Sequence, residues 1–141
     1  MSAAFFDTNV IAYAAGSAEE EKAKRDAARN LMQTRSITIS TQVMLELYGV
    51  LRKKLAYSAD AAIEWVQTLQ GDTVVSLTAA DVLGAIAIAR RYDISHWDGL
   101  ILVAAENAGL DLVYTEDLNH GQTYGKVRVC NPFIEDFLAR K

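Results

Sequence analysis

Two hydrophobic patterns alternate along this chain. Short runs of apolar or alternating residues are typical of β-strands, whereas longer segments with apolar residues at every third or fourth position are typical of amphipathic helices. The short runs predict strands at residues 3–6, 36–40, 73–77, 112–114 and 126–130. The last of these strands is expected at an edge of its sheet. The longer segments predict helices at residues 9–15, 18–34, 42–55, 59–70, 79–92, 96–107 and 133–138.

Strands that alternate with helices indicate an α/β fold. We expect a mostly parallel central sheet of about five strands, with helices on both faces. The helix predicted at 96–107 is apolar nearly all round between residues 100 and 105, so it should be buried at the centre of the molecule. Ligands of such a sheet bind beyond the carboxyl ends of its strands, so side chains that follow strands are the first candidates for a site.

The composition is that of one folded domain. The 141 residues are 51% hydrophobic and 23% charged, which suits a single domain over residues 1–141 and argues against a disordered chain. The longest apolar run, at 82–89, is too short to span a bilayer. The amino terminus lacks the basic region of a secretory signal, and the single cysteine, Cys130, excludes an internal disulfide. We therefore expect a cytoplasmic protein with no membrane segment.

The charge balance does not indicate a broad nucleic-acid-binding surface. The chain has 14 basic and 18 acidic residues, a net charge of −4, whereas nucleic-acid-binding domains usually carry a basic face. Nucleic acid stays open as a ligand, because bound metal ions supply positive charge locally. The positions of the acidic residues therefore decide the question.

Two acidic residues in the first half of the chain lie beside apolar residues, at positions where we would not expect a carboxylate that is simply exposed to water. Asp7 ends the first predicted strand, although an aspartate there also suits the N-cap of a helix. Glu46 shares a helix face with the apolar Val43 and Val50. We expect Glu46 to lose hydration and to need a partner or a metal. The alternative is a surface glutamate at the margin of that apolar stripe.

A third carboxylate, Asp98, lies in the first turn of the most apolar helix. It follows Ser95 by three residues, a spacing at which its side chain could instead close a capping box. Asp81 has the same spacing after Thr78 and serves as a comparison, because nothing else marks Asp81 as functional.

A fourth carboxylate, Asp117, comes just after the strand at 112–114, where the alternative is an Asx-turn. Its neighbour Glu116 is expected to be solvated. Together the four residues place carboxylates from separate segments at one rim of the sheet. Like charges that close raise one another's pKa unless cations neutralise them. Oxygen-only ligands favour Mg²⁺ or Mn²⁺, and such ions activate water for displacement at phosphorus.

No other catalytic pattern in the sequence competes well. The chain has no glycine-rich phosphate loop, no Gly-x-Ser-x-Gly elbow and no histidine pair with metal-ligand spacing. His96 is expected to help begin its helix, and His120 is expected to be a polar loop residue. The acidic residues therefore remain the candidate catalytic groups.

Four segments around these carboxylates resemble one known family, the PIN-domain ribonucleases, and specifically the VapC toxins of type II toxin–antitoxin pairs. The segments are FDTNV (6–10), STQVMLE (40–46), YDISHWDGLI (92–101) and LVYTEDL (112–118). Their order and spacing match the family over essentially the whole chain. One departure is Gly99, where alanine is common in the family. We expect this glycine only to weaken the first turn of its helix slightly.

The resemblance implies a PIN-like fold and Mg²⁺-dependent cleavage of RNA by water, with Mn²⁺ as the alternative ion. The implied metal ligands and catalytic residues are Asp7, Glu46, Asp98 and Asp117. Asn9 would orient the site or the substrate, and Thr115 would support Asp117. The implied partners are an RNA substrate, a cognate VapB-like antitoxin that blocks the site, and a second copy of the chain in a homodimer.

Other functions fit the sequence less well. A hydrolase of the haloacid-dehalogenase type would need a second aspartate at position 9, where the chain has Asn9. A response-regulator receiver would need a phospho-acceptor aspartate after a central strand and a lysine after a later one, and neither arrangement is present. A PIN domain kept for binding alone would be expected to lack a site carboxylate. The main alternative is a PIN nuclease of RNA processing or degradation that has no antitoxin partner.

Overall fold

The computed structural model describes residues 1–134, in which one sheet has the strand order β3-β2-β1-β4-β6-β5. The strands are β1 (Ala3–Phe6), β2 (Ser36–Ser40), β3 (Thr73–Val75), β4 (Leu112–Tyr114), β5 (Thr123–Tyr124) and β6 (Val127–Cys130). All neighbouring strands pair in parallel except β5, which is antiparallel to β6. The mostly parallel α/β sheet predicted from the sequence is therefore confirmed.

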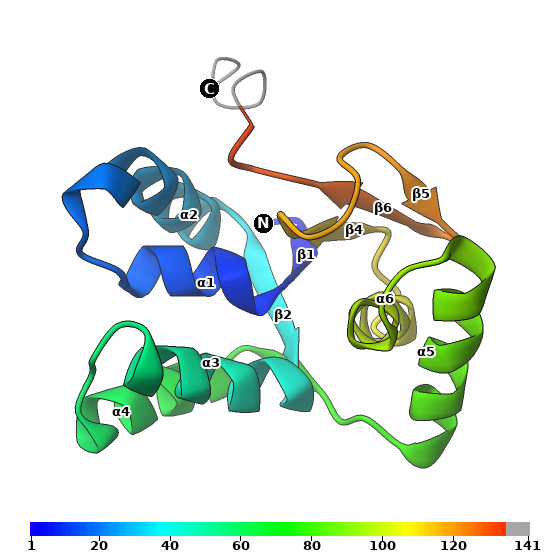
Figure 1. The fold of residues 1–141 in the computed structure, drawn as a ribbon, viewed down its shortest axis with the longest axis horizontal. Helices are drawn as coiled ribbons and strands as arrows, with labels where there is room; N and C mark the ends of the chain where they lie inside the picture. The colour runs from blue at the N-terminus through cyan, green and yellow to red at the C-terminus, as the bar shows by residue number, and fades with distance from the viewer. Residues whose placement is uncertain (135–141) are drawn as a thin grey trace.

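Helices cover both faces of this sheet, as the alternation of patterns predicts. They are α1 (Thr8–Ala15), the 3₁₀ turn η1 (Glu19–Glu21), α2 (Lys22–Thr34), α3 (Thr41–Lys53), α4 (Ala59–Gln70), α5 (Ala79–Tyr92) and α6 (His96–Asn107). Figure 1 shows α1 and α2 on one side of the sheet and α5 and α6 on the other, with α3 beside α1. None of the helices within residues 1–134 has the length and hydropathy that crossing a membrane requires.

The register of the central strands brings two of the candidate site segments together. Strand β1 pairs with β4 so that Phe6 lies opposite Tyr114. The Asp7 N–H then donates to the Tyr114 carbonyl at 3.0 Å, one position beyond the last paired residue. Since both strands run in the same direction, the residues that follow them emerge at the same edge of the sheet.

Three local details differ from the sequence predictions. The sheet has six strands in the described residues, because β5 forms a short hairpin with β6 and takes the edge position expected for 126–130. The helix predicted at 18–34 begins only at Lys22, after a 3₁₀ turn of three consecutive glutamates. Helix α3 begins at Thr41, one residue before the predicted start, because it is capped by Ser40, whose hydroxyl accepts from the Val43 N–H at 3.3 Å. Of the closing helix expected at 133–138, residues 135–138 lie outside the described part of the chain.

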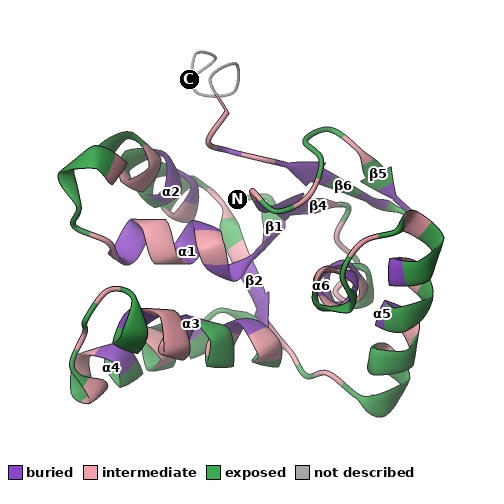
Figure 2. Ribbon diagram, in the orientation of Figure 1, coloured by how far each residue is buried: buried purple, intermediate pink, exposed green. Residues whose placement is uncertain are grey.

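The core lies between the sheet and its helices (Figure 2). The middle of helix α6 is buried or half-buried, in agreement with its apolar sequence, and the buried positions include Ile101, Leu102 and Ala105. It packs closely on α5 at Gly99, where a Cβ atom would come within 2.4 Å of the Ala85 carbonyl oxygen. The glycine therefore permits the two helix backbones to approach. This close contact outweighs the slight weakening of the first helical turn that was expected from the sequence.

Candidate active site

Asp7 is the most buried of the candidate carboxylates, with 5% of its surface exposed. It follows β1 directly, and its Oδ1 accepts from the Thr8 N–H at 2.7 Å, so it also caps α1. Its Oδ2 accepts from the Thr115 hydroxyl at 2.8 Å. The pKa of Asp7 is raised to about 7, mainly by burial and to a smaller extent by the charges of Asp117 and Glu46, while the hydrogen bonds from Thr115 and Thr8 oppose the rise.

Asp98 and Asp81 share a position in their helices but differ in what their carboxylates do. The Asp81 side chain accepts from the Thr78 N–H at 2.8 Å and closes a capping box on α5. At the start of α6, Ser95 accepts from the Asp98 N–H at 3.0 Å. Within residues 1–134, no backbone N–H donates to the Asp98 carboxylate. The cap of α6 therefore needs the backbone of Asp98 and not its carboxylate.

The half-buried Asp98 carboxylate lies in an acidic environment. Burial raises the pKa of Asp98, and the neighbouring Asp117 and Glu46 charges add to the rise, against a hydrogen bond to the Ser95 side chain. A carboxylate with these neighbours is more stable when a cation is bound, because the cation offsets the repulsion between like charges.

Asp117 lies in the loop after β4 and is held by two neighbours. The Asn9 amide donates to its Oδ2 at 3.0 Å, and the Asp117 N–H donates to the Thr115 hydroxyl at 3.1 Å. The same Asn9 nitrogen lies 3.3 Å from Asp7 Oδ2 and 3.2 Å from the Thr115 hydroxyl. Asn9 and Thr115 thus connect the carboxylate at the end of β1 with the one after β4.

Three of the four predicted carboxylates meet closely. One oxygen each from Asp7, Asp98 and Asp117 lies within 4.8 Å of the others. These oxygens are the hard donors that Mg²⁺ and Mn²⁺ prefer. Burial and the neighbouring acidic charges raise the pKa of Asp7, so a bound cation would stabilise its charged form. The donor set and its charge therefore fit a divalent cation.

Glu46 lies beside this cluster and is not a member of it. It is exposed, so the expected loss of hydration is wrong, and the alternative of a glutamate at the margin of the apolar stripe describes its position. Its carboxylate accepts from the Thr8 hydroxyl at 2.9 Å and from the Gln42 amide at 3.3 Å. Glu46 is still near enough to raise the pKa of both Asp7 and Asp98.

The carboxylates open into a groove that extends between α1 and α3. Its lining includes all four candidate carboxylates, the exposed apolar Leu45 and Trp97, and, further along α3, Lys53 and Lys54. The lining also includes Glu20, Glu21 and Glu116, so the groove has apolar walls and a mixed charge outside the acidic cluster. Lys53 and Lys54 are the positions at which a segment of an anionic ligand could be bound.

Neither histidine lines this groove or belongs to the acidic cluster. His96 is the exposed first residue of α6 and contacts the Trp97 ring. His120 accepts from the Asn131 N–H at 2.9 Å through Nδ1, so it holds a loop to the segment after β6. Both histidines therefore have structural contacts that account for them.

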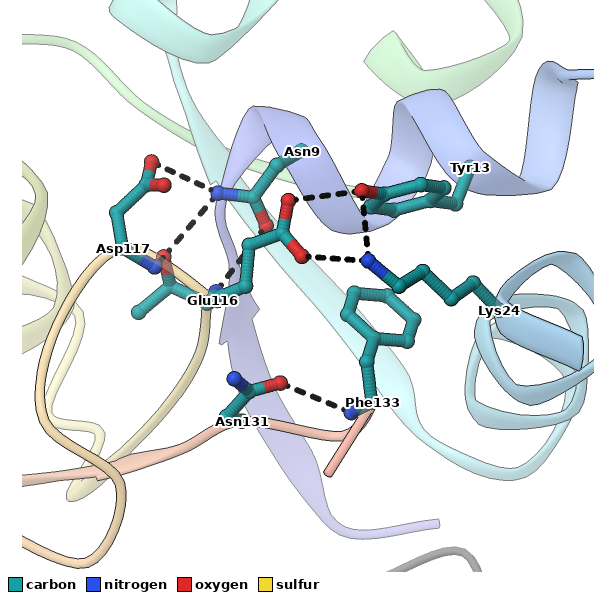
Figure 3. A network of polar contacts seen from close by, with 8 residues as sticks. Asn9, Tyr13, Lys24, Glu116, Asp117, Asn131 and Phe133 are labelled. Atoms are coloured by element: carbon teal, nitrogen blue, oxygen red, sulfur yellow. Dashed lines mark hydrogen bonds and ion pairs between the residues drawn. The ribbon is translucent and has the colours of Figure 1, made fainter. Parts of the chain in front are cut away.

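Sequence reasoning missed a second polar network that adjoins the acidic cluster (Figure 3). Glu116 was expected to be solvated, but its carboxylate accepts from the Tyr13 hydroxyl at 2.9 Å and forms an ion pair with Lys24 at 3.4 Å. Lys24 sits four residues after Glu20, a spacing typical of an ion pair within one helix. The contact that forms instead spans separate elements, and no local spacing in the sequence signals it.

Comparisons with known proteins agree with this fold. A family model described as PIN domain matches residues 4–126. No curated protein sequence matches the chain significantly. Similar solved structures include a toxin–antitoxin complex from Klebsiella pneumoniae, with 18% identity, 93% of this chain and 98% of that chain covered, and a TM-score of 0.67.

Two further structures have the same fold at similar sequence distance. The Mycobacterium tuberculosis toxin VapC20, described as cleaving the sarcin-ricin loop, has 20% identity, 79% of this chain and 87% of that chain covered, and a TM-score of 0.64. The Rickettsia felis VapBC2 complex bound to a promoter DNA fragment has 16% identity, coverage of 89% and 95%, and a TM-score of 0.58. Because the family model matches most of its residues, this chain belongs to the PIN domain family.

Proposed function

We propose that this protein is a Mg²⁺-dependent endoribonuclease and the toxin of a type II toxin–antitoxin pair. The observation that carries the proposal is the meeting of Asp7, Asp98 and Asp117, each with an oxygen within 4.8 Å of the others, in a chain of the PIN domain family. An oxygen-only site of this kind suits phosphodiester hydrolysis, since displacement at phosphorus needs neutralisation of charge on the phosphate.

The position of each carboxylate determines its role in the proposed reaction. A bound Mg²⁺ would lower the pKa of a coordinated water and neutralise charge on the scissile phosphate. Asp7 is the central ligand in this proposal, because burial and hydrogen bonds at both of its oxygens fix its orientation. Asp98 and Asp117 complete the set from α6 and from the loop after β4. Mn²⁺ fits the same donors.

Glu46 has a different role in the proposed reaction. Its carboxylate is exposed, lines the groove and stands outside the cluster of three. It is therefore placed to accept a proton from the attacking water, while its charge also holds cations near the site. Asn9 and Thr115 act by holding Asp7 and Asp117 in place, through the hydrogen bonds described above.

The proposed substrate is RNA, bound along the groove between α1 and α3. Lys53 and Lys54 at its far end would contact phosphates, which fixes the position of a strand without reading its sequence. The M. tuberculosis neighbour is described as a toxin that cleaves the sarcin-ricin loop, which supports a nucleic-acid substrate here.

The proposed partner is a VapB-like antitoxin that covers the carboxylates. Two of the similar structures are toxin–antitoxin complexes, and these favour the toxin over a PIN nuclease with no antitoxin. We also propose that the protein forms a homodimer. Light scattering would measure its molecular mass in solution. Relief of growth arrest by a co-expressed neighbouring reading frame would separate the toxin from the processing nuclease.

Cleavage of RNA by the purified protein tests the proposed chemistry. We expect cleavage with Mg²⁺ or Mn²⁺, none in EDTA, and recovery when the metal is restored. Ca²⁺ should bind but support little cleavage, because its larger and looser coordination shell positions water poorly. Asp7→Asn should remain folded and lose activity at least 10- to 100-fold. Full cleavage in EDTA, or an Asp7→Asn variant within a few-fold of wild type, would overturn the proposal.

A further inference from the structure

The network that joins Tyr13, Lys24 and Glu116 connects three separate elements next to the acidic cluster. Tyr13 lies on α1, Lys24 on α2, and Glu116 in the loop after β4 (Figure 3). The Lys24 ammonium lies 3.1 Å from the Tyr13 hydroxyl and 4.8 Å from the centre of its ring. The Tyr13 ring also packs edge-on against Phe133, with ring centres 4.8 Å apart. The network thus has polar and apolar contacts on several sides.

Glu116 of this network directly precedes Asp117 in the chain and is also connected to it through the Asn9 side chain. The Glu116 N–H donates to the Asn9 carbonyl oxygen, Oδ1, at 3.4 Å. The amide nitrogen of the same Asn9 side chain donates to Asp117 at 3.0 Å. Fixing Glu116 therefore fixes both the loop that carries Asp117 and the direction in which the Asn9 amide points.

We propose that Tyr13, Lys24 and Glu116 are positioning residues that hold Asp117 and Asn9 at the acidic cluster. Asp117 needs such support, because it is exposed and lies in a loop, whereas Asp7 is held by a buried strand and Asp98 by a helix. The inference rests on the proposed function only where metal binding is concerned. The arrangement of the loop is independent of it.

A Lys24 variant can distinguish a positioning role from a purely electrostatic effect of the lysine charge. Removing a positive charge near an acidic site should strengthen cation binding if charge alone matters. If Lys24 instead positions Asp117, its removal should weaken cation binding, which is a change of opposite sign. Lys24→Met keeps the apolar stem of the side chain over the Tyr13 ring. Lys22→Met is its matched control, because Lys22 lies on the same helix and, among residues 1–134, forms its ion pair with the exposed Asp26 alone.

Tyr13→Phe provides a second test that changes no charge. The variant keeps the ring that packs on Phe133 and loses the hydroxyl that contacts Glu116 and Lys24. Tyr57→Phe is its control. The Tyr57 hydroxyl donates to the Ala15 carbonyl at 2.7 Å, so this variant also removes a hydrogen bond to α1, at a point away from Glu116.

The deciding measurement is titration of the metal-free proteins with Mn²⁺, followed by electron paramagnetic resonance. We expect Tyr13→Phe and Lys24→Met to bind Mn²⁺ about 10-fold more weakly than wild type, the lower end of the range for groups that orient ligands. Tyr57→Phe and Lys22→Met should bind as wild type does. Wild-type affinity in Tyr13→Phe, tighter binding in Lys24→Met, or equal weakening in Tyr57→Phe would overturn the inference.

Amide hydrogen exchange supplies a reading that needs no metal. Residues 116–118 should exchange faster in Tyr13→Phe than in Tyr57→Phe, because Glu116 loses the hydrogen bond that the Tyr13 hydroxyl donates to its carboxylate. If wild type bound no Mn²⁺, the proposed metal site would be wrong. The exchange rates would then decide the inference alone, since equal rates in the two variants would overturn it.

Discussion

The Thr115 hydroxyl donates to Asp7 Oδ2 at 2.8 Å, although the two residues lie 108 positions apart in the chain. Thr115 is fully buried, and the same hydroxyl accepts from the Asp117 N–H at 3.1 Å. One hydroxyl therefore orients one carboxylate and anchors the backbone of another. This small group is the direct link between the end of β1 and the loop after β4.

Replacing Thr115 by valine should therefore weaken both the fold and the site. The change keeps the shape but leaves the Asp7 oxygen and the Asp117 N–H without this partner, which costs about 1–3 kcal/mol of unfolding free energy. Metal affinity should fall about 10- to 100-fold. Urea unfolding and Mn²⁺ titration measure the two effects. Thr115→Ser, which keeps the hydroxyl, should retain most of both, and an unchanged metal affinity in Thr115→Val would contradict the link.

Asp98→Ala and Asp81→Ala should separate activity from stability. Alanine at 98 keeps the backbone N–H that Ser95 caps, so the fold should survive while cleavage and toxicity on expression are lost. Alanine at 81 removes a carboxylate that binds the Thr78 N–H and the Asn107 amide. That variant should lose about 1 kcal/mol of stability, as cap substitutions do, and keep its activity.

Circular dichroism, RNA cleavage and growth together check this pair. A folded Asp98→Ala protein that still cuts RNA and arrests growth would show that Asp98 has no role in the metal site. An inactive but folded Asp81→Ala protein would show that activity is sensitive to helix caps in general.

The stability of the metal-free protein should fall as pH rises from about 4 to about 7. The Asp7 carboxyl has a pKa of about 7 in the fold, against 3.8 for an unperturbed aspartate, so the folded state holds a proton that the unfolded chain has released. Stability then declines with pH across this interval, by an amount on the order of 4 kcal/mol, and levels off above it. Urea unfolding across the pH range measures the slope.

Two comparisons check that the slope comes from Asp7. Asp7→Asn should flatten it, because asparagine does not titrate. Saturating Mg²⁺ should restore stability at neutral pH, since a ligand that binds only the folded state stabilises it. A slope that persists in Asp7→Asn would assign it to other groups.

Gly99→Ala should destabilise the protein in spite of alanine's better helix propensity. Its Cβ atom would lie 2.4 Å from the Ala85 carbonyl oxygen, so α5 and α6 would have to separate, at a cost of about 1–3 kcal/mol. Gly49→Ala on α3 is the control, because nothing lies within 4 Å of its added Cβ. That variant should gain about 0.5–1 kcal/mol. Thermal unfolding of both variants decides whether the close helix contact is required.

Much of the fold could be predicted from the sequence because its signals are local. The strand at 3–6 is a continuous apolar run that ends at a charged residue, and the helix at 96–107 has both a Ser95 cap and an apolar body. Such features act within a few residues, so the pattern reports them directly. Strand β5 could not be predicted, because it has only two residues and exists through its pairing with β6.

For the candidate site, the positions of the carboxylates along the chain could be predicted better than their exposure and their contacts. The positions of Asp7 and Asp117 follow from the ends of two strands, and the parallel sheet brings such ends together. The exposure of Glu46 and the binding of Glu116 depend on how α1, α2 and the loop after β4 pack in space. No spacing along the chain encodes those contacts, so both expectations from sequence were wrong.

The parallel pairing of β1 with β4 also has a consequence for the time at which the site can appear. The amino-terminal strand leaves the ribosome early, but its neighbour β4 and the following Asp117 are synthesised long afterwards. A growing chain that has just received Asp98 still lacks the third carboxylate of the cluster. On the proposed function, the nascent protein is therefore harmless to the RNA of the ribosome that makes it until Asp117 has been added and the strand before it has paired.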